Sequence, residues 1–168
     1  DVCLAIRHPS DFLASIYSQI LLSGKDVSPQ EFLARNMPSD VDWSNYVADL
    51  RSATGLGRLT IWRYEDYAAV FPAICAALVG PQAADHVTPV PERVMPRLSQ
   101  AAVATIMAQR GQDTETRRVA DIAATQPSDT DNPPFELFDT ELRAVADQFY
   151  AAQTAAIAQT PGVKLLRP

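Results

Sequence analysis

Residues 2–17 read VCLAIRHPSDFLASIY, and this stretch decides the fold class. Residues 2–6 are apolar and partly β-branched, which predicts a strand buried on both faces, as in a parallel sheet. Ser10 is a candidate helix N-cap, and the apolar residues after it recur at helical spacing as far as Gly24. A strand that is followed this closely by an amphipathic helix is the first half of a βα unit.

Strand and helix patterns continue along the rest of the chain. The segment 81–96 holds four prolines and is expected to be a loop. The 168 residues are therefore expected to form a single α/β domain. The other predicted elements are, in order, a short helix after a capping box at Ser28 and Glu31, a helix from Trp43 to near Gly55, a buried strand over 59–62, a helix from Tyr67 that Gly80 closes, helices after Ser99 and Asp113, a long helix that ends before Pro161, and a last strand over 163–166.

Charge and composition argue against several classes of function. The formal net charge is −6, and nucleic-acid and membrane-surface binders need a basic surface, so neither kind of partner is expected. No apolar run approaches the roughly 18 residues that span a bilayer. The two cysteines, Cys3 and Cys75, stand in apolar segments without Cys or His neighbours at metal-ligand spacing. We therefore expect core thiols, no metal site, and a reducing, cytoplasmic location.

Two polar side chains of the opening stretch have the chemistry to bind a phosphate. Arg7 follows the first strand, and ligands in open α/β sheets sit beyond the carboxyl ends of strands. Ser15 falls about one and a half turns into the next helix, on its polar face. A guanidinium offers a planar fork of donors that matches phosphate oxygens, and a hydroxyl adds a neutral donor. On spacing alone, the favoured interpretation is an Arg that ends a strand in solvent and a Ser on a hydrated helix face.

The pattern Arg-x-Pro with a Ser eight residues after the Arg resembles a known cofactor-binding segment. Sulfotransferases that use 3′-phosphoadenosine 5′-phosphosulfate (PAPS) hold the 3′-phosphate with such a segment, after an apolar strand. The resemblance implies that Arg7 and Ser15 bind the 3′-phosphate of PAPS. It also implies a P-loop NTPase-like fold, in which helices flank a parallel sheet.

A second stretch carries the same resemblance. Residues 59–67 read LTIWRYEDY, which is similar to the family's strand that ends in Tyr-Glu-Asp before a helix. The resemblance implies that Tyr64 lies against the adenine, whereas the residues alone also allow Tyr64 to pack at a strand end. Glu65 and Asp66 are expected to cap the following helix rather than act as catalytic acids, because carboxylates suit a helix N-terminus.

The chain departs from the family pattern in its phosphosulfate loop. Family members bind the 5′-phosphosulfate with an N-terminal Gly-, Ser- or Thr- and Lys-rich loop, and the lysines here are only Lys25 and Lys164. We therefore expect this chain to correspond to the C-terminal two-thirds of the family fold, with that loop and the catalytic base upstream of Asp1. The family's Arg-Lys-Gly loop is also missing, and Arg97 and Arg110 are the candidates to replace it.

The expected function of the intact protein is therefore transfer of a sulfuryl group from PAPS, without a metal, to a hydroxyl or amine of a small-molecule, glycan or lipid acceptor. This chain alone is expected to be inactive. His8 is expected to be structural, and His86 has no identifiable partner in the sequence. Two alternatives are a P-loop phosphotransferase that uses ATP and a sulfotransferase-like binding domain without catalysis. The sequence identifies neither the acceptor nor the oligomeric state.

Overall fold

The protein is described by a computed structural model over residues 1–90, 97–111 and 116–168, with the side chains of residues 116 and 117 left out. The described residues form two compact units. The first unit comprises residues 1–9, 41–90 and 144–168, and the second comprises residues 10–40, 97–111 and 116–143. The expectation of a single domain stays a prediction.

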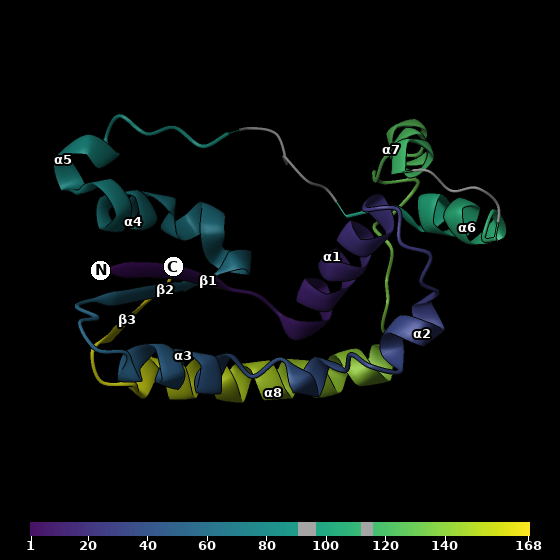
Figure 1. Cartoon of the computed structure of the whole chain (residues 1–168). Helices are drawn as coiled ribbons and strands as arrows, with labels where there is room; N and C mark the ends of the chain where they lie inside the picture. The colour runs from purple at the N-terminus through teal and green to yellow at the C-terminus, as the bar shows by residue number, and fades with distance from the viewer. Residues whose placement is uncertain (91–96, 112–115) are drawn as a thin grey trace. The chain divides into compact units, whose positions relative to one another are not determined.

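The first unit is built on a parallel sheet with strand order β1-β2-β3 (Figure 1). The strands in this described part of the chain are β1 (Val2–Ile6), β2 (Leu59–Arg63) and β3 (Val163–Leu166). Val2 pairs with Leu59, and Leu59 pairs with Val163, so all three strands run in the same direction. The class predicted from the sequence, α/β with a parallel sheet flanked by helices, is confirmed at this level.

Helices cover both faces of this sheet (Figure 1). Ile6, Leu59 and Ile61 point to one face, where they pack with Val47 of α3 (Trp43–Ser52) and Ile157 of α8. Trp62 and Leu166 point to the other face, against Val70 and Ile74 of α4 (Tyr67–Val79). The central strand β2 is therefore buried on both sides, as its apolar sequence predicts. The long helix α8 spans Thr140–Gln159, and its residues from Ala144 onward belong to this unit.

The first strand is less buried than its sequence predicts. Ile6 is buried, but Ala5 is exposed and residues 2–4 are only partly buried. The reason is the strand order, because β1 lies at an edge of the described sheet and has a neighbouring strand on one side only. An apolar run of five residues cannot by itself distinguish an edge strand from a central one.

The second unit is helical and packs around the aromatic ring of Tyr17. Tyr17 is fully buried on α1 (Pro9–Leu22), and its ring contacts Phe32 and Phe135 at centroid distances of 5.3 and 5.8 Å. The Tyr17 hydroxyl donates a hydrogen bond of 2.9 Å to the carbonyl of Val27. The other elements of this unit are α2 (Pro29–Leu33), the 3₁₀ helix η1 (Pro38–Asp40), α6 (Gln100–Ala108) and α7 (Thr116–Thr125).

Two of the helix N-caps predicted from the sequence are confirmed, and a third is wrong. The capping box of Ser28 and Glu31 opens α2, and Ser99 caps α6 by accepting the N–H of Ala102 at 3.1 Å. Ser10 is not an N-cap, because α1 already begins at Pro9, and a proline suits the first turn of a helix.

Two segments bear on the remaining expectations. The segment from residue 81, predicted as a loop, opens with the short helix α5 (Pro81–Ala84), and its part from residue 91 to 96 lies outside the described residues, as does Asp113. No helix within the described ranges is long and apolar enough to cross a membrane.

Candidate functional site

An arginine stands at the carboxyl end of each strand of the sheet, either as its last residue or directly after it. Arg7 directly follows β1, Arg63 is the last residue of β2, and Arg167 directly follows β3. The register pairs Ile6 with Arg63 and Trp62 with Leu166, so the three arginines stand at one edge of the sheet. The carboxyl edge is where open α/β sheets bind ligands. Three cationic residues at this edge make it a candidate site for an anion.

Arg7 and Tyr64 form a pair at this edge. The guanidinium carbon of Arg7 lies 4.7 Å from the centroid of the Tyr64 ring, which is a cation–π contact. Tyr64 begins the 3₁₀ helix η2 (Tyr64–Asp66) directly after β2, and 47% of its surface stays exposed. The carbonyl of Arg7 accepts a hydrogen bond of 2.7 Å from the indole N–H of Trp43, which fixes the backbone where the arginine leaves the strand.

Arg63 is neutralised by a neighbouring carboxylate. Its Nε and Nη2 atoms donate to the two carboxylate oxygens of Asp66 at 2.6 and 2.8 Å, a bidentate pair. The hydrogen bond that Arg63 donates to Asp66 raises the pKa of Arg63 above its ordinary value. Asp66 makes no side-chain hydrogen bond at the start of α4, so its predicted capping role is wrong. Arg63, three residues earlier in the chain, binds the Asp66 carboxylate instead.

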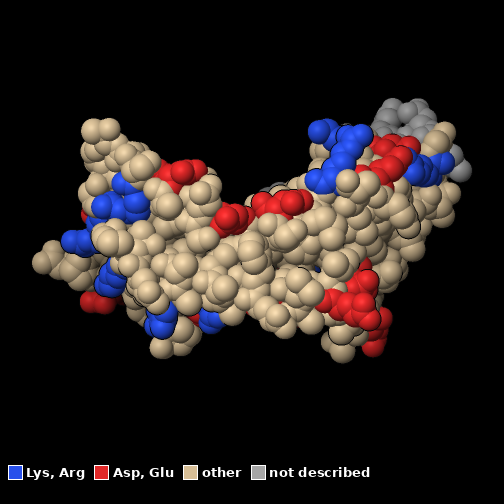
Figure 2. Space-filling model, turned by 90° about the horizontal axis from the view of Figure 1, so that it is seen from below, with Lys and Arg blue, Asp and Glu red and all other residues tan. Residues whose placement is uncertain are grey.

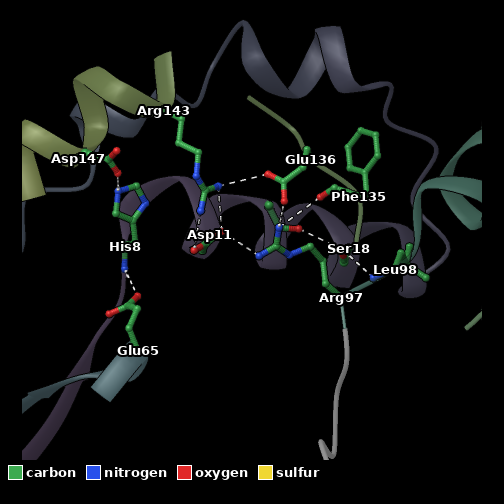
Figure 3. Close-up of polar contacts among 11 residues, drawn as sticks. His8, Asp11, Ser18, Glu65, Arg97, Leu98, Phe135, Glu136, Arg143 and Asp147 are labelled. Atoms are coloured by element: carbon green, nitrogen blue, oxygen red, sulfur yellow. Dashed lines mark hydrogen bonds and ion pairs between the residues drawn. The ribbon is translucent and has the colours of Figure 1, made fainter. Parts of the chain in front are cut away.

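Glu65 also has partners other than the helix N-terminus. Its Oε1 atom accepts the backbone N–H of His8 at 2.7 Å, and its Oε2 atom accepts the Tyr150 hydroxyl at 3.1 Å (Figure 3 shows the His8 contact). Burial raises the pKa of Tyr150, and the negative charge of Glu65 raises it further. The expectation that Glu65 caps α4 is therefore wrong as well, since both of its oxygens face residues distant in sequence.

His8 lies in the turn between β1 and α1, and the expectation that it is structural stays a prediction. Its buried ring packs edge-on against Tyr150 at a centroid distance of 5.3 Å. Neither ring nitrogen makes a well-aligned hydrogen bond to a residue that the structure describes, and Nε2 lies 2.8 Å from Oδ1 of Asp147 (Figure 3). This contact is an ion pair only when the imidazole is protonated.

A pocket of about 220 Å³ lies beside the ends of β2 and β3. Arg63 and Thr154 give it a polar side, and the Thr154 hydroxyl donates to the carbonyl of Tyr150 at 2.7 Å. Leu165 and Leu166 give it an apolar side. Arg167 also lines it, and its guanidinium makes no ion pair within the ranges that the structure covers.

The structure brings together two of the three predicted cofactor-binding residues. Arg7 and Tyr64 belong to the first unit, whereas Ser15 is partly buried on α1 in the second unit. Arg7 and Tyr64 are thus the part of the predicted site that one unit contains by itself. The assignment of Arg7, Ser15 and Tyr64 to a cofactor stays a prediction.

The arginines suggested as replacements for a phosphate-binding loop are engaged elsewhere. Arg97 donates to Asp11 at 2.9 Å and to Glu136 at 3.4 Å (Figure 3). Arg110 donates to Asp26 at 2.9 Å and to Glu31 at 2.6 Å. Because carboxylates already occupy both guanidinium groups, neither arginine is a good candidate to bind a phosphate.

Figure 2 shows lysine and arginine side chains in separate groups on the face drawn. The expectation that the protein has no nucleic-acid partner stays a prediction. His86 is exposed. Among the described residues, no three His, Cys, Asp or Glu side chains gather as a metal site would require. The expectation that the protein works without a metal stays a prediction.

Comparisons of the chain with protein-family models, with curated proteins and with solved structures found no match.

Sequence reasoning missed the contacts that hold the carboxyl edge together. The indole of Trp43, the carboxylate of Glu65 and the hydroxyl of Tyr150 all act across long sequence separations, up to 85 residues for the pair Glu65 and Tyr150. No local pattern marks such pairs. The one available signal was chemical, because a buried Tyr hydroxyl needs a hydrogen-bond partner.

Proposed function

We propose that this chain is the part of a PAPS-dependent sulfotransferase that binds the 3′-phosphoadenosine end of the cofactor, on a P-loop NTPase-like sheet. The intact protein would transfer the sulfuryl group to a hydroxyl or amine acceptor without a metal. In that reaction the acceptor atom bonds to sulfur, the bond from sulfur to the bridging phosphate oxygen breaks, and a base takes the acceptor's proton. Adenosine 3′,5′-bisphosphate leaves.

The observation that carries the proposal is the pair of Arg7 and Tyr64 at the carboxyl edge, with 4.7 Å between the guanidinium carbon and the ring centroid. An arginine beside an exposed aromatic ring offers the two kinds of contact that a phosphorylated adenosine needs. The guanidinium can donate to phosphate oxygens, and the ring can stack on a base. The sequence stretches around both residues resemble the corresponding family segments.

The proposal makes a distinction between nucleotides that calorimetric titration can measure. Adenosine 3′,5′-bisphosphate has the 3′-phosphate, and adenosine 5′-monophosphate lacks it. The protein should bind the bisphosphate more tightly. Arg7→Ala should weaken bisphosphate binding by about 1.5–3 kcal/mol, because a charge-assisted hydrogen bond is lost, and should leave the monophosphate nearly unaffected. Arg58→Ala is the matched control, since Arg58 is an exposed arginine at the opposite end of β2.

The other two predicted residues have separate signatures in the same titrations. Tyr64→Ala should weaken both nucleotides alike, by about 1–3 kcal/mol, because stacking on adenine does not depend on the 3′-phosphate. Ser15→Ala should weaken only the bisphosphate, by about 0.5–1.5 kcal/mol, as expected for a neutral hydrogen bond. Equal affinity of the wild type for the two nucleotides would refute the proposal. Tighter binding of ATP that requires Mg²⁺ would favour the phosphotransferase alternative.

A further inference from the structure

Glu65 links the two turns that carry the proposed cofactor-binding pair. Through Oε1 it accepts the backbone N–H of His8, which neighbours Arg7 in the turn of residues 7–9. Through its own backbone it belongs to η2, directly after Tyr64. Through Oε2 it accepts the hydroxyl of Tyr150, a buried residue of α8. One carboxylate therefore joins the end of β1, the end of β2 and a helix of the core.

Other contacts of this unit also hold the turn of residues 7–9. The Trp43 indole donates to the Arg7 carbonyl at 2.7 Å, and the imidazole of His8 rests on Tyr150 and Asp147. The backbone N–H of His8 donates to Oε1 of Glu65 at 2.7 Å. Loss of the carboxylate would leave this amide without its acceptor and release the turn on the side of Tyr64.

We propose that Glu65 is a positioning residue, which holds the Arg7 guanidinium beside Tyr64 so that the pair is ready for a 3′-phosphate. The inference rests on the function proposed above. It predicts that Glu65 strengthens anion binding, whereas its negative charge alone would weaken it. A carboxylate near an anion site repels the anion, so its charge alone disfavours binding, and a positioning role must outweigh this repulsion.

The direction in which one substitution changes the affinity for adenosine 3′,5′-bisphosphate tests the inference. In the wild type, the His8 amide and the Tyr150 hydroxyl donate to different oxygens of Glu65. Glu65→Gln removes the negative charge and leaves a single side-chain oxygen to accept from these two donors. If Glu65 acts only through its charge, the variant should bind adenosine 3′,5′-bisphosphate more tightly than the wild type. If Glu65 positions Arg7, the variant should bind about tenfold more weakly, which is the lower end of the effect of a lost hydrogen bond to a charged group. Asp85→Asn is the matched control, and its affinity should be unchanged, because Asp85 is an exposed carboxylate at the end of α5 and belongs to neither of the two turns.

A double-mutant cycle separates positioning from general loss of structure. Glu65→Gln in the Arg7→Ala background should have less than about a threefold effect, because the residue it positions is gone. An equal tenfold loss with and without Arg7 would show that Glu65 does not act through the arginine. Thermal unfolding of each variant shows that the proteins compared are folded.

A readout without nucleotide keeps the inference testable if the wild type binds no bisphosphate, an outcome that would refute the proposed function itself. The chain has two tryptophans, so its NMR spectrum has two indole N–H signals. The Trp43 indole is bonded to the Arg7 carbonyl, whereas the buried Trp62 indole has no hydrogen-bond partner among the described residues and serves as the internal reference. Glu65→Gln should raise the hydrogen-exchange rate of the Trp43 indole several-fold relative to that of Trp62. Unchanged exchange at Trp43, or tighter binding by Glu65→Gln, would overturn the inference.

Discussion

Replacing Asp11 by Asn should lower the free energy of unfolding by about 3 kcal/mol, because Asp11 joins two arginines and is itself largely buried, as is Arg97. Its Oδ1 atom accepts from Arg97 at 2.9 Å and from Arg143 at 3.2 Å, and its Oδ2 atom accepts from Arg143 at 3.2 Å (Figure 3). The Asp11 and Arg97 side chains are only 19% and 12% exposed.

The magnitude follows from what the substitution leaves behind. Breaking a buried ion pair by removing one partner costs about 3–5 kcal/mol. The lower end applies here, because Glu136 still accepts from Arg97 at 3.4 Å and from Arg143 at 3.2 Å. Glu136 itself is 58% exposed, so Glu136→Gln should cost less than about 1 kcal/mol and is the matched control.

The effect of Asp11 should also depend on pH. Burial raises the pKa of Asp11, but hydrogen bonds and charge from Arg143 and Arg97 outweigh burial, so the pKa lies below its ordinary value of 3.8. The folded state then takes up a proton less readily than the unfolded state. The stabilisation is fully present above the unfolded pKa and is lost as the pH falls through the folded one.

Urea denaturation at pH 7 and at pH 3, followed by circular dichroism, measures both effects. The difference between wild type and Asp11→Asn should be largest at pH 7 and should shrink at pH 3. A difference of less than about 0.5 kcal/mol at pH 7, which is the range of ordinary surface substitutions, would refute the reasoning. A difference that grows on acidification would refute the sign of the pKa shift.

Two further predictions concern the second unit. Ser99→Ala should lower the free energy of unfolding by about 2 kcal/mol in urea denaturation, because the buried Ser99 hydroxyl both caps α6 and donates to the Gln126 carbonyl at 2.7 Å. The exposed Ser39→Ala is its control, and equal losses in the two variants would contradict the prediction. The hydrogen bond from Arg110, with a further one from the Ser28 backbone, lowers the pKa of Glu31 to about 2, so Arg110→Ala should raise this pKa toward its ordinary value of 4.5 in a carbon NMR titration. A pKa that stays near 2 in Arg110→Ala would assign the shift to the capping box alone.

Elements with a local signal could be predicted from the sequence. The strand at residues 59–62 is a mostly apolar run between Arg58 and Arg63, and it is the buried central strand. The capping box at Ser28 and the serine at position 99 define helix starts because an N-cap works through an amide only a few residues ahead. Gly80 closes α4 with a φ of 86°, a conformation that glycine adopts without strain.

Partners chosen by the tertiary structure could not be predicted. Glu65 and Asp66 satisfy the sequence rule for acidic residues at a helix start, yet one binds the His8 amide 57 residues away and the other binds Arg63. Arg97 has the chemistry of a phosphate ligand, but Asp11 holds it from 86 residues away. A carboxylate and a phosphate are equivalent partners for a guanidinium, so only the spatial arrangement shows which one an arginine contacts.

The parallel pairing of β1, β2 and β3 has a consequence for how the protein is made. Val2 must find Leu59, and Leu59 must find Val163, so every ladder of the sheet closes a long loop, and such topologies fold slowly. On the ribosome, β2 has no partner on its β3 side until residues 163–166 have been synthesised. During that interval an apolar strand edge is open to other nascent chains, which is the condition under which aggregation competes with folding and chaperones are needed.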